Sequence, residues 1–72
     1  MIKEEELKRL GDKVRLARIE KKMSQTELAN RIYKDQPSLN RLEKGNINPS
    51  YIYLLEVCGG LEISLEELLN SY

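Results

Sequence analysis

The stretch that decides the fold is residues 24–45, SQTELANRIYKDQPSLNRLEKG. Its first four residues form a capping box, in which the Ser24 hydroxyl and the Glu27 carboxylate each satisfy a backbone N–H that would otherwise lack a partner at the start of a helix. Further along, Asp35 can cap a second helix with Pro37 in its first turn, where the missing N–H of proline costs nothing. The stretch therefore predicts two short helices joined by a three-residue turn, over about 25–32 and 35–44.

The second of these helices has an apolar and a polar face. Leu39 and Leu42 are spaced to point into a core, whereas the outer face carries Gln36, Ser38, Asn40 and Arg41. Glutamine and asparagine can pair with adenine through two hydrogen bonds, and arginine can pair with guanine or with phosphate. A helix pair of this kind lets one helix lie across the DNA backbone while the next enters the major groove. An ordinary solvated helix face has a similar composition, so composition alone does not decide between the two interpretations.

Capping residues, glycines and prolines divide the rest of the chain into three more helices. A long helix over about 3–22 comes first, with an apolar stripe at helical spacing on one face and charges on the other. After the loop at 46–49, Ser50 caps a fourth helix, and a second capping box at 64–67 starts a fifth helix that ends near residue 70. The sequence therefore predicts an all-α fold of five helices.

The length of 72 residues corresponds to one domain, which we expect to span residues 1–72. The single cysteine, Cys58, cannot close a bridge within the chain, and without histidine no zinc site is complete. Cys58 is interpreted as a small buried hydrophobe rather than a redox sensor. No apolar run has the length of a secretory signal or a membrane span, so we expect a soluble, cytoplasmic protein.

Charge is balanced over the whole chain, with 12 basic and 12 acidic residues, but it is unevenly distributed. All 12 basic residues lie within 3–44 together with eight acidic ones, which gives this part a net charge of +4 and leaves −4 for the rest. The basic part could face phosphate while the acidic part faces protein. Charge alone nevertheless favours the simpler interpretation that lysine and glutamate solvate the helix surfaces.

Four blocks of sequence resemble those of the Cro/cI-type helix-turn-helix domains, also called the lambda-repressor-like or Xre family. The blocks are SQTELA at 24–29, LNRLEKG at 39–45, NPS at 48–50 and ISLEEL at 63–68. Each block is weak alone, but their order and spacing together are specific, and the likeness covers about residues 7–69. The resemblance implies a compact five-helix fold, with a helix-turn-helix at about 25–44 and a recognition helix at 35–44.

The resemblance also implies which residues meet DNA. Gln25, at the start of the second helix, would contact phosphate and support the first residue of the recognition helix, while Gln36 and Asn40 would contact base edges. Phosphate contacts are expected from Lys34, Lys44 and Arg41, although Arg41 is suited to bases as well. The full set is Gln25, Lys34, Gln36, Pro37, Ser38, Asn40, Arg41, Lys44, Asn46 and Asn48.

The family often pairs an arginine late in the first helix with a glutamate near the end of the recognition helix. The resemblance therefore implies a structural ion pair, partly buried, between Arg18 and Glu43. Losing one partner of such a pair would cost more than losing one partner of a surface ion pair.

Several positions depart from the family's pattern. Tyr33 stands where the turn between the two helices usually has a glycine, and Glu62 stands where a glycine often precedes the last helix. Tyrosine tolerates a positive φ poorly, so we expect a different backbone in the turn, with the Tyr33 ring packed on the first helix. Lys34 and Pro37 replace commoner small or apolar residues. These changes affect the expected docking angle on DNA and not the fold.

The fourth predicted helix is too apolar for one core. Tyr51 and Tyr53, beside Ile52 and Leu55, cannot all face the same side of a helix. The surplus apolar surface suggests a partner, and crowded packing under the first helix is the alternative explanation. The residues assigned to a homodimer interface are Tyr51, Ile52, Leu55, Leu65, Leu68, Leu69 and Tyr72.

We expect a sequence-specific, double-stranded DNA-binding transcriptional regulator, a repressor or an autoregulator, that acts as a homodimer on a palindromic operator. Such a chain would resemble Cro-like phage repressors, restriction-modification controller proteins or the DNA-binding half of an antitoxin. The alternative is a protein-interaction module, or an antitoxin-type partner, that uses the same fold. An enzyme is poorly supported, because the sequence has no histidine, no glycine-rich phosphate loop and no metal-ligand cluster. We accordingly expect no catalytic residue, metal, cofactor or small-molecule ligand.

Overall fold

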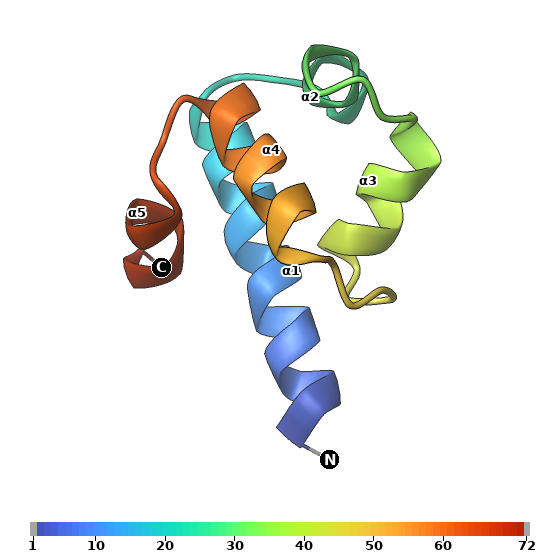
Figure 1. Ribbon diagram of the computed structural model, residues 1–72, viewed down its shortest axis with the longest axis vertical. Coiled ribbons are helices and arrows are strands. Elements are labelled where there is room, and N and C mark those ends of the chain that lie inside the picture. The colour runs from blue at the N-terminus through green and yellow to red at the C-terminus, as the bar shows by residue number, and fades with distance from the viewer. Residues whose placement is uncertain (1, 72) are drawn as a thin grey trace.

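The computed structural model describes residues 2–71, which form five helices and no strands. The helices are α1 (Ile2–Glu20), α2 (Gln25–Arg31), α3 (Gln36–Glu43), α4 (Tyr51–Leu61) and α5 (Leu65–Asn70). α1 is the long central helix and contacts α3, α4 and α5, whereas α2 contacts α3 and α4 (Figure 1). α3 and α5 lie on opposite sides of α1 (Figure 1). The predicted all-α fold of five helices is confirmed.

Each of the four shorter helices begins at a side-chain cap. A side-chain oxygen of Ser24, Asp35, Ser50 and Ser64 accepts a hydrogen bond from the backbone N–H three residues later. At α2 and α5 the capping box is complete, because the backbone N–H of the serine also donates to the glutamate at that third position. Both predicted capping boxes are therefore present, and α3 begins one residue later than predicted because Asp35 is its cap.

The core takes side chains from every helix. Those with almost no exposed surface are Val14, Leu28, Leu39, Leu42, Val57, Leu61 and Leu68. Leu68 is fully buried within the chain, so its assignment to a dimer interface is wrong. Cys58 is buried beside this core, and burial raises the pKa of its thiol, which agrees with the interpretation of Cys58 as a small hydrophobe. Within residues 2–71, none of the helices combines the length and the apolar character that crossing a bilayer requires.

The first four helices end in the same kind of turn, around one residue with a left-handed backbone. These residues are Lys22, Tyr33, Gly45 and Glu62. The N–H of each donates to the carbonyl three residues back, and the next N–H donates to the carbonyl five residues before it. This is the Schellman arrangement, whose two hydrogen bonds offset the cost of about 1–2 kcal/mol that a left-handed backbone imposes on a residue with a Cβ.

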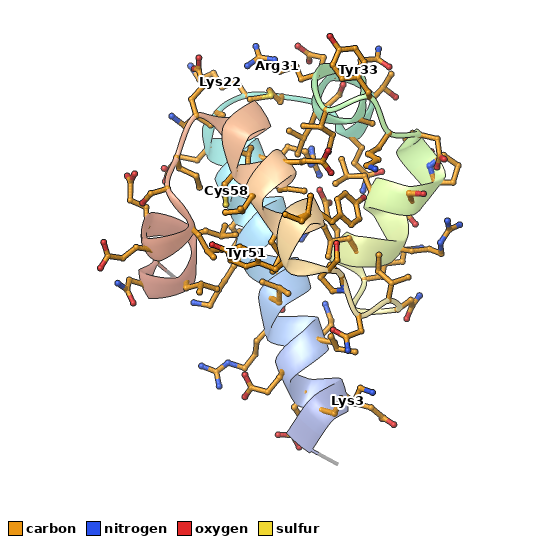
Figure 2. The ribbon with its side chains drawn as sticks, in the orientation of Figure 1. Lys3, Lys22, Arg31, Tyr33, Tyr51 and Cys58 are labelled. Carbon is orange, nitrogen blue, oxygen red and sulfur yellow. The ribbon has the colours of Figure 1, made fainter. Side chains whose placement is uncertain are left out.

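The turn before α3 therefore differs from the expectation in two ways. Tyr33 does adopt a positive φ of 59°, so the predicted change of backbone does not occur. Its ring does not pack on α1 either, because Tyr33 is 95% exposed. Tyr33 and Lys3 lie at opposite ends of the molecule (Figure 2). The two hydrogen bonds of this turn stabilise the left-handed backbone at Tyr33, a position where the family usually has a glycine.

α1 and the C-terminal end of α3 approach each other closely at two glycines. A Cβ atom on Gly11 would lie 2.5 Å from the backbone oxygen of Glu43, and one on Gly45 would lie 2.8 Å from the Cα atom of Lys8. In both cases the neighbour is backbone, which cannot move aside as a flexible side chain can. The two glycines therefore set how closely α3 packs against α1.

Candidate nucleic-acid interface

α3 has two faces that differ in burial. Leu39, Leu42 and Glu43 are buried against the rest of the chain. At the helical period of 100° per residue, the opposite side of the same helix carries Gln36, Pro37, Asn40, Arg41 and Lys44, all half-buried or exposed. The helix thus presents amide and basic side chains away from the core, as the sequence predicts.

A buried ion pair ties α1 to α3. The Arg18 guanidinium donates from Nε to Glu43 Oε2 over 2.7 Å and from Nη2 to Glu43 Oε1 over 3.0 Å. Arg18 Nη1 also donates to the backbone oxygen of Met23 over 2.8 Å. Glu43 is only 3% exposed, so the Arg18 guanidinium compensates for the hydration that the carboxylate loses on burial. The structure contains the pair that the family resemblance implied.

Gln25 connects this ion pair to the outer face of α3. Its Nε2 donates to Glu43 Oε1 over 3.0 Å. Its Oε1 accepts two hydrogen bonds, one from Gln36 Nε2 and one from Asn40 Nδ2 over 3.3 Å. Three of the amides predicted to meet DNA, Gln25, Gln36 and Asn40, are therefore joined to one another and, through Glu43, to α1.

The start of α3 is fixed by Asp35. Hydrogen bonds from the backbone N–H and the hydroxyl of Ser38 hold the pKa of the Asp35 carboxyl below its ordinary value. Arg41 Nη2 in turn donates to the Ser38 hydroxyl over 3.2 Å, so the arginine lies along the helix surface. Of the predicted contact residues on α3, Ser38 is half-buried, while Pro37 and Arg41 are exposed.

Lys34 is directed toward α4. Its Nζ lies 3.7 Å from Glu56 Oε1 and 5.5 Å from the centre of the Tyr53 ring. These contacts place the Lys34 ammonium group against α4. The exposed ion pair contributes little to stability, and a phosphate could compete for the same ammonium group.

The segment after α3 supplies the rest of the predicted set. Lys44 is the C-cap of α3, and Lys44, Asn46 and Asn48 are all exposed. The backbone N–H of Asn46 donates to the Arg41 carbonyl over 2.9 Å, which holds the start of this loop against the end of the helix. The loop thus continues the exposed surface of α3.

The residues assigned to a dimer interface divide into three groups. Tyr51 and Ile52 on α4 are 63% and 62% exposed, and Leu55 and Leu69 are 38% and 46% exposed. Leu65 is half-buried against the core, and Leu68 is fully buried, as described above. Tyr72 lies outside the described residues. Among these residues the most exposed side chains are therefore Tyr51 and Ile52, at the start of α4.

A surface hollow of about 490 Å³ lies between the C-terminal ends of α2 and α4, where Arg31, Tyr33, Gly59 and Glu62 line it. None of the predicted DNA-contacting residues lines this hollow. In the described part of the chain, no group of three or more histidine, cysteine, aspartate or glutamate residues could hold a metal ion.

This fold and this arrangement of side chains define a class of protein. A family model described as helix-turn-helix matches residues 14–68, and the chain belongs to the Cro/cI-type helix-turn-helix family of DNA-binding domains. The match spans the C-terminal part of α1, all of α2, α3 and α4, and the first four residues of α5.

Solved structures show the same fold. The restriction-modification controller protein C.AhdI from Aeromonas hydrophila is 30% identical, with a TM-score of 0.85 over 88% of this chain and 96% of that chain. The clp gene regulator ClgR from Corynebacterium glutamicum is 31% identical in two structures, with TM-scores of 0.84 and 0.83. Each of these two matches covers 86% of this chain, and they cover 80% and 66% of the respective ClgR chains. No curated protein matches this chain in sequence.

Proposed function

We propose that this chain is a sequence-specific regulator of transcription, a repressor or an autoregulator, that inserts α3 into the major groove of double-stranded DNA. The observation that carries the proposal is the amide cluster on the outer face of α3, where Gln36 and Asn40 are held by Gln25. Amide side chains fixed in this way can discriminate between base edges, and a helix is the element that fits the major groove. The published descriptions of C.AhdI and ClgR as regulators support this assignment.

The phosphate contacts follow from the same geometry. The Gln25 nitrogen carries a second hydrogen that Glu43 does not use, and it is available to a phosphate oxygen beside α3. Arg41 and Lys44 supply positive charge on the exposed side of α3, and Asn46 and Asn48 extend the contact along the following loop. Lys34 would join them by exchanging Glu56 for a phosphate.

The proposed assembly is a homodimer in the cytoplasm, a single domain per chain, on a palindromic operator with half-sites about 34 Å apart, one helical turn of DNA. The exposed apolar side chains Tyr51, Ile52 and Leu55 on α4 support a contact between two copies. We assign no enzymatic activity, because the family and the neighbouring structures are those of DNA-binding regulators.

The salt dependence of DNA binding tests the assignment of the interface. For a duplex found by selection from random sequences, the logarithm of affinity should fall with the logarithm of salt concentration by about 0.9 per phosphate neutralised. Lys44→Ala should reduce this slope by about 1. The matched control is Lys13→Ala, which should leave the slope unchanged because the Lys13 ammonium group donates to the Ser71 carbonyl on the side of α1 away from α3. Equal slopes for wild type and Lys44→Ala would remove Lys44 from the interface, and no binding to any duplex would leave the protein-interaction module as the function.

Sedimentation tests the assembly. Ile52→Glu places a charge on the exposed start of α4 and should convert a dimer at micromolar concentration into a monomer. Ile19→Glu, on an exposed position of α1 outside the proposed contact, is the matched control and should leave the dimer intact. Monomeric wild-type protein would count against a homodimer.

A further inference from the structure

A single buried carboxylate determines which way the amides of the DNA-facing surface point. A carboxylate only accepts hydrogen bonds, so Gln25 must present its nitrogen to Glu43 and its oxygen to α3. Gln36 and Asn40 must then present their nitrogens to that oxygen, which is the arrangement observed. Reversing any of the three amides would place two acceptors or two donors face to face.

This orientation decides what the two amides on α3 offer to a base. Each amide nitrogen has two hydrogens, and Gln36 and Asn40 each use one of them on Gln25. Each side chain therefore retains one N–H donor and its carbonyl acceptor. In the major groove adenine presents one acceptor, N7, and one donor, the N6 amino group, whereas guanine presents two acceptors. An amide held in this orientation matches adenine and opposes guanine.

The spacing of the two amides limits where their bases lie. The nitrogens of Gln36 and Asn40 are both within hydrogen-bonding distance of one oxygen atom of Gln25. They are therefore closer to each other than two base-pair rises of about 3.4 Å each. Because each nitrogen reaches an acceptor about 3 Å further away, their partners lie no more than about three base pairs apart, on either strand.

We infer that Glu43, acting through Gln25, is a positioning residue for base specificity, and that each half-site contains two adenines no more than about three base pairs apart. The inference rests on the proposed function, because it requires α3 to face the bases. Glu43 itself is buried and does not touch DNA. Its effect on the orientation of the amides passes through Gln25.

Gln25→Met tests the inference, because methionine has a similar size but cannot form the hydrogen bonds of Gln25 with Glu43, Gln36 and Asn40. The Arg18–Glu43 pair remains in this variant. Selection of bound sites from random duplex DNA by the wild-type chain identifies the two positions. In Gln25→Met the preference for adenine over guanine at both should fall by about tenfold, since the amides of Gln36 and Asn40 can then rotate. Lys44→Ala is the matched control: affinity falls for every sequence alike, and the adenine preference stays.

A double variant tests the direction of the effect. Arg18→Met combined with Glu43→Gln removes both buried charges together and places an amide at position 43 that can donate to Gln25. Gln25 can then turn over, so that Gln36 and Asn40 present both hydrogens of their nitrogens to DNA. This variant should accept guanine at positions where the wild type selects adenine. Circular dichroism tests whether this double variant is folded. If it is not folded, Gln25→Met alone tests the role of Glu43.

The outcomes separate the inference from the proposed function. Selection of two adenines by the wild type, with the preference lost in Gln25→Met, supports both. An unchanged adenine preference in Gln25→Met, or wild-type sites without two such adenines, overturns the role of Glu43 while DNA binding stands. A wild-type chain that binds no duplex at low ionic strength overturns both.

Discussion

Gly11 of α1 lies directly against the backbone of Glu43 at the end of α3, where a Cβ atom would stand 2.5 Å from the Glu43 carbonyl oxygen. Because neither backbone can move aside, Gly11→Ala should separate the two helices and lower the free energy of unfolding by about 1–3 kcal/mol. Urea denaturation measures the change. The intrinsic preference of alanine for helices works in the opposite direction, so stability equal to or above that of wild type would show that α3 does not pack so closely on α1.

The two adjacent glycines in α4 should respond in opposite ways to the same substitution. No atom lies within 4 Å of a Cβ on Gly59, so Gly59→Ala should raise the free energy of unfolding by about 0.5–1 kcal/mol through the lower chain entropy of alanine. A Cβ on Gly60 would lie 2.7 Å from the Ile32 Cγ2 methyl group and 2.8 Å from the Leu28 Cδ1 methyl group, so Gly60→Ala should be destabilising because these buried side chains must be displaced. Thermal unfolding of the two variants side by side is the measurement, and the same sign for both would contradict the packing of α2 on α4.

The Arg18–Glu43 pair should show strong coupling in a double-mutant cycle. Glu43→Gln leaves a buried arginine without its carboxylate, and Arg18→Met leaves a buried carboxylate without its arginine, so each single change should cost about 3–5 kcal/mol. The double variant removes both charges and should be less destabilised than either single variant. Denaturation of all four proteins gives the coupling energy, and additive effects would show that the pair is not buried as described.

Tyr53→Phe should stabilise the fold. The Tyr53 hydroxyl is buried without a hydrogen-bond partner, and burial raises its pKa. Removing the hydroxyl should remove the cost of burying a polar group that has no hydrogen bond, and it should raise the free energy of unfolding by about 1 kcal/mol. Tyr51→Phe, at an exposed position of the same helix, is the control and should change little. A less stable Tyr53→Phe variant would reveal a partner for the hydroxyl.

The cap of α3 should make stability depend on pH. The hydrogen bonds from Ser38 lower the pKa of Asp35 in the folded chain, so the folded state releases this proton more readily than the unfolded state. The contribution is complete above the ordinary pKa of aspartate and is lost as the pH falls through the lower value of the folded state. Asp35→Asn keeps a capping oxygen without the charge, so the difference in melting temperature between wild type and Asp35→Asn should shrink over that interval. A difference independent of pH would contradict the assignment.

The ends of the helices could be predicted from sequence because their causes are local. Ser24 and Glu27 lie three residues apart, and the capping box that they form needs nothing from the rest of the chain. Tyr33 shows the limit of such reasoning. Its preference against a positive φ is also local, but two backbone hydrogen bonds and the packing of the adjoining helices outweigh it.

The candidate site was predictable in its outward-facing residues and much less so in its internal connections. The polar face of α3 follows from helical spacing, and the family resemblance supplied Gln25 and the Arg18–Glu43 pair. The two hydrogen bonds that join Gln25 to Glu43 and to Asn40 connect residues 18 and 15 positions apart, and no periodic pattern indicates them. Nothing in the sequence marks Gly11, since a glycine inside a helix gives no sign of what will pack against it. The assignment of Leu68 to a dimer interface is wrong because the hydrophobic pattern of α5 does not distinguish a core face from a partner face.

Glu43 bonds both Arg18 and Gln25, and this limits how the sequence of such a regulator can change during evolution. A side chain that both anchors two helices and orients three amides is poorly placed to be exchanged, since a single replacement would damage folding before any new operator could be tried. Gln36 and Asn40 donate side-chain hydrogen bonds to Gln25 from the outer face of α3 and can vary at far smaller structural cost. New target sequences would therefore be expected to arise by replacement of Gln36 and Asn40, while Gln25 and Glu43 are inherited unchanged.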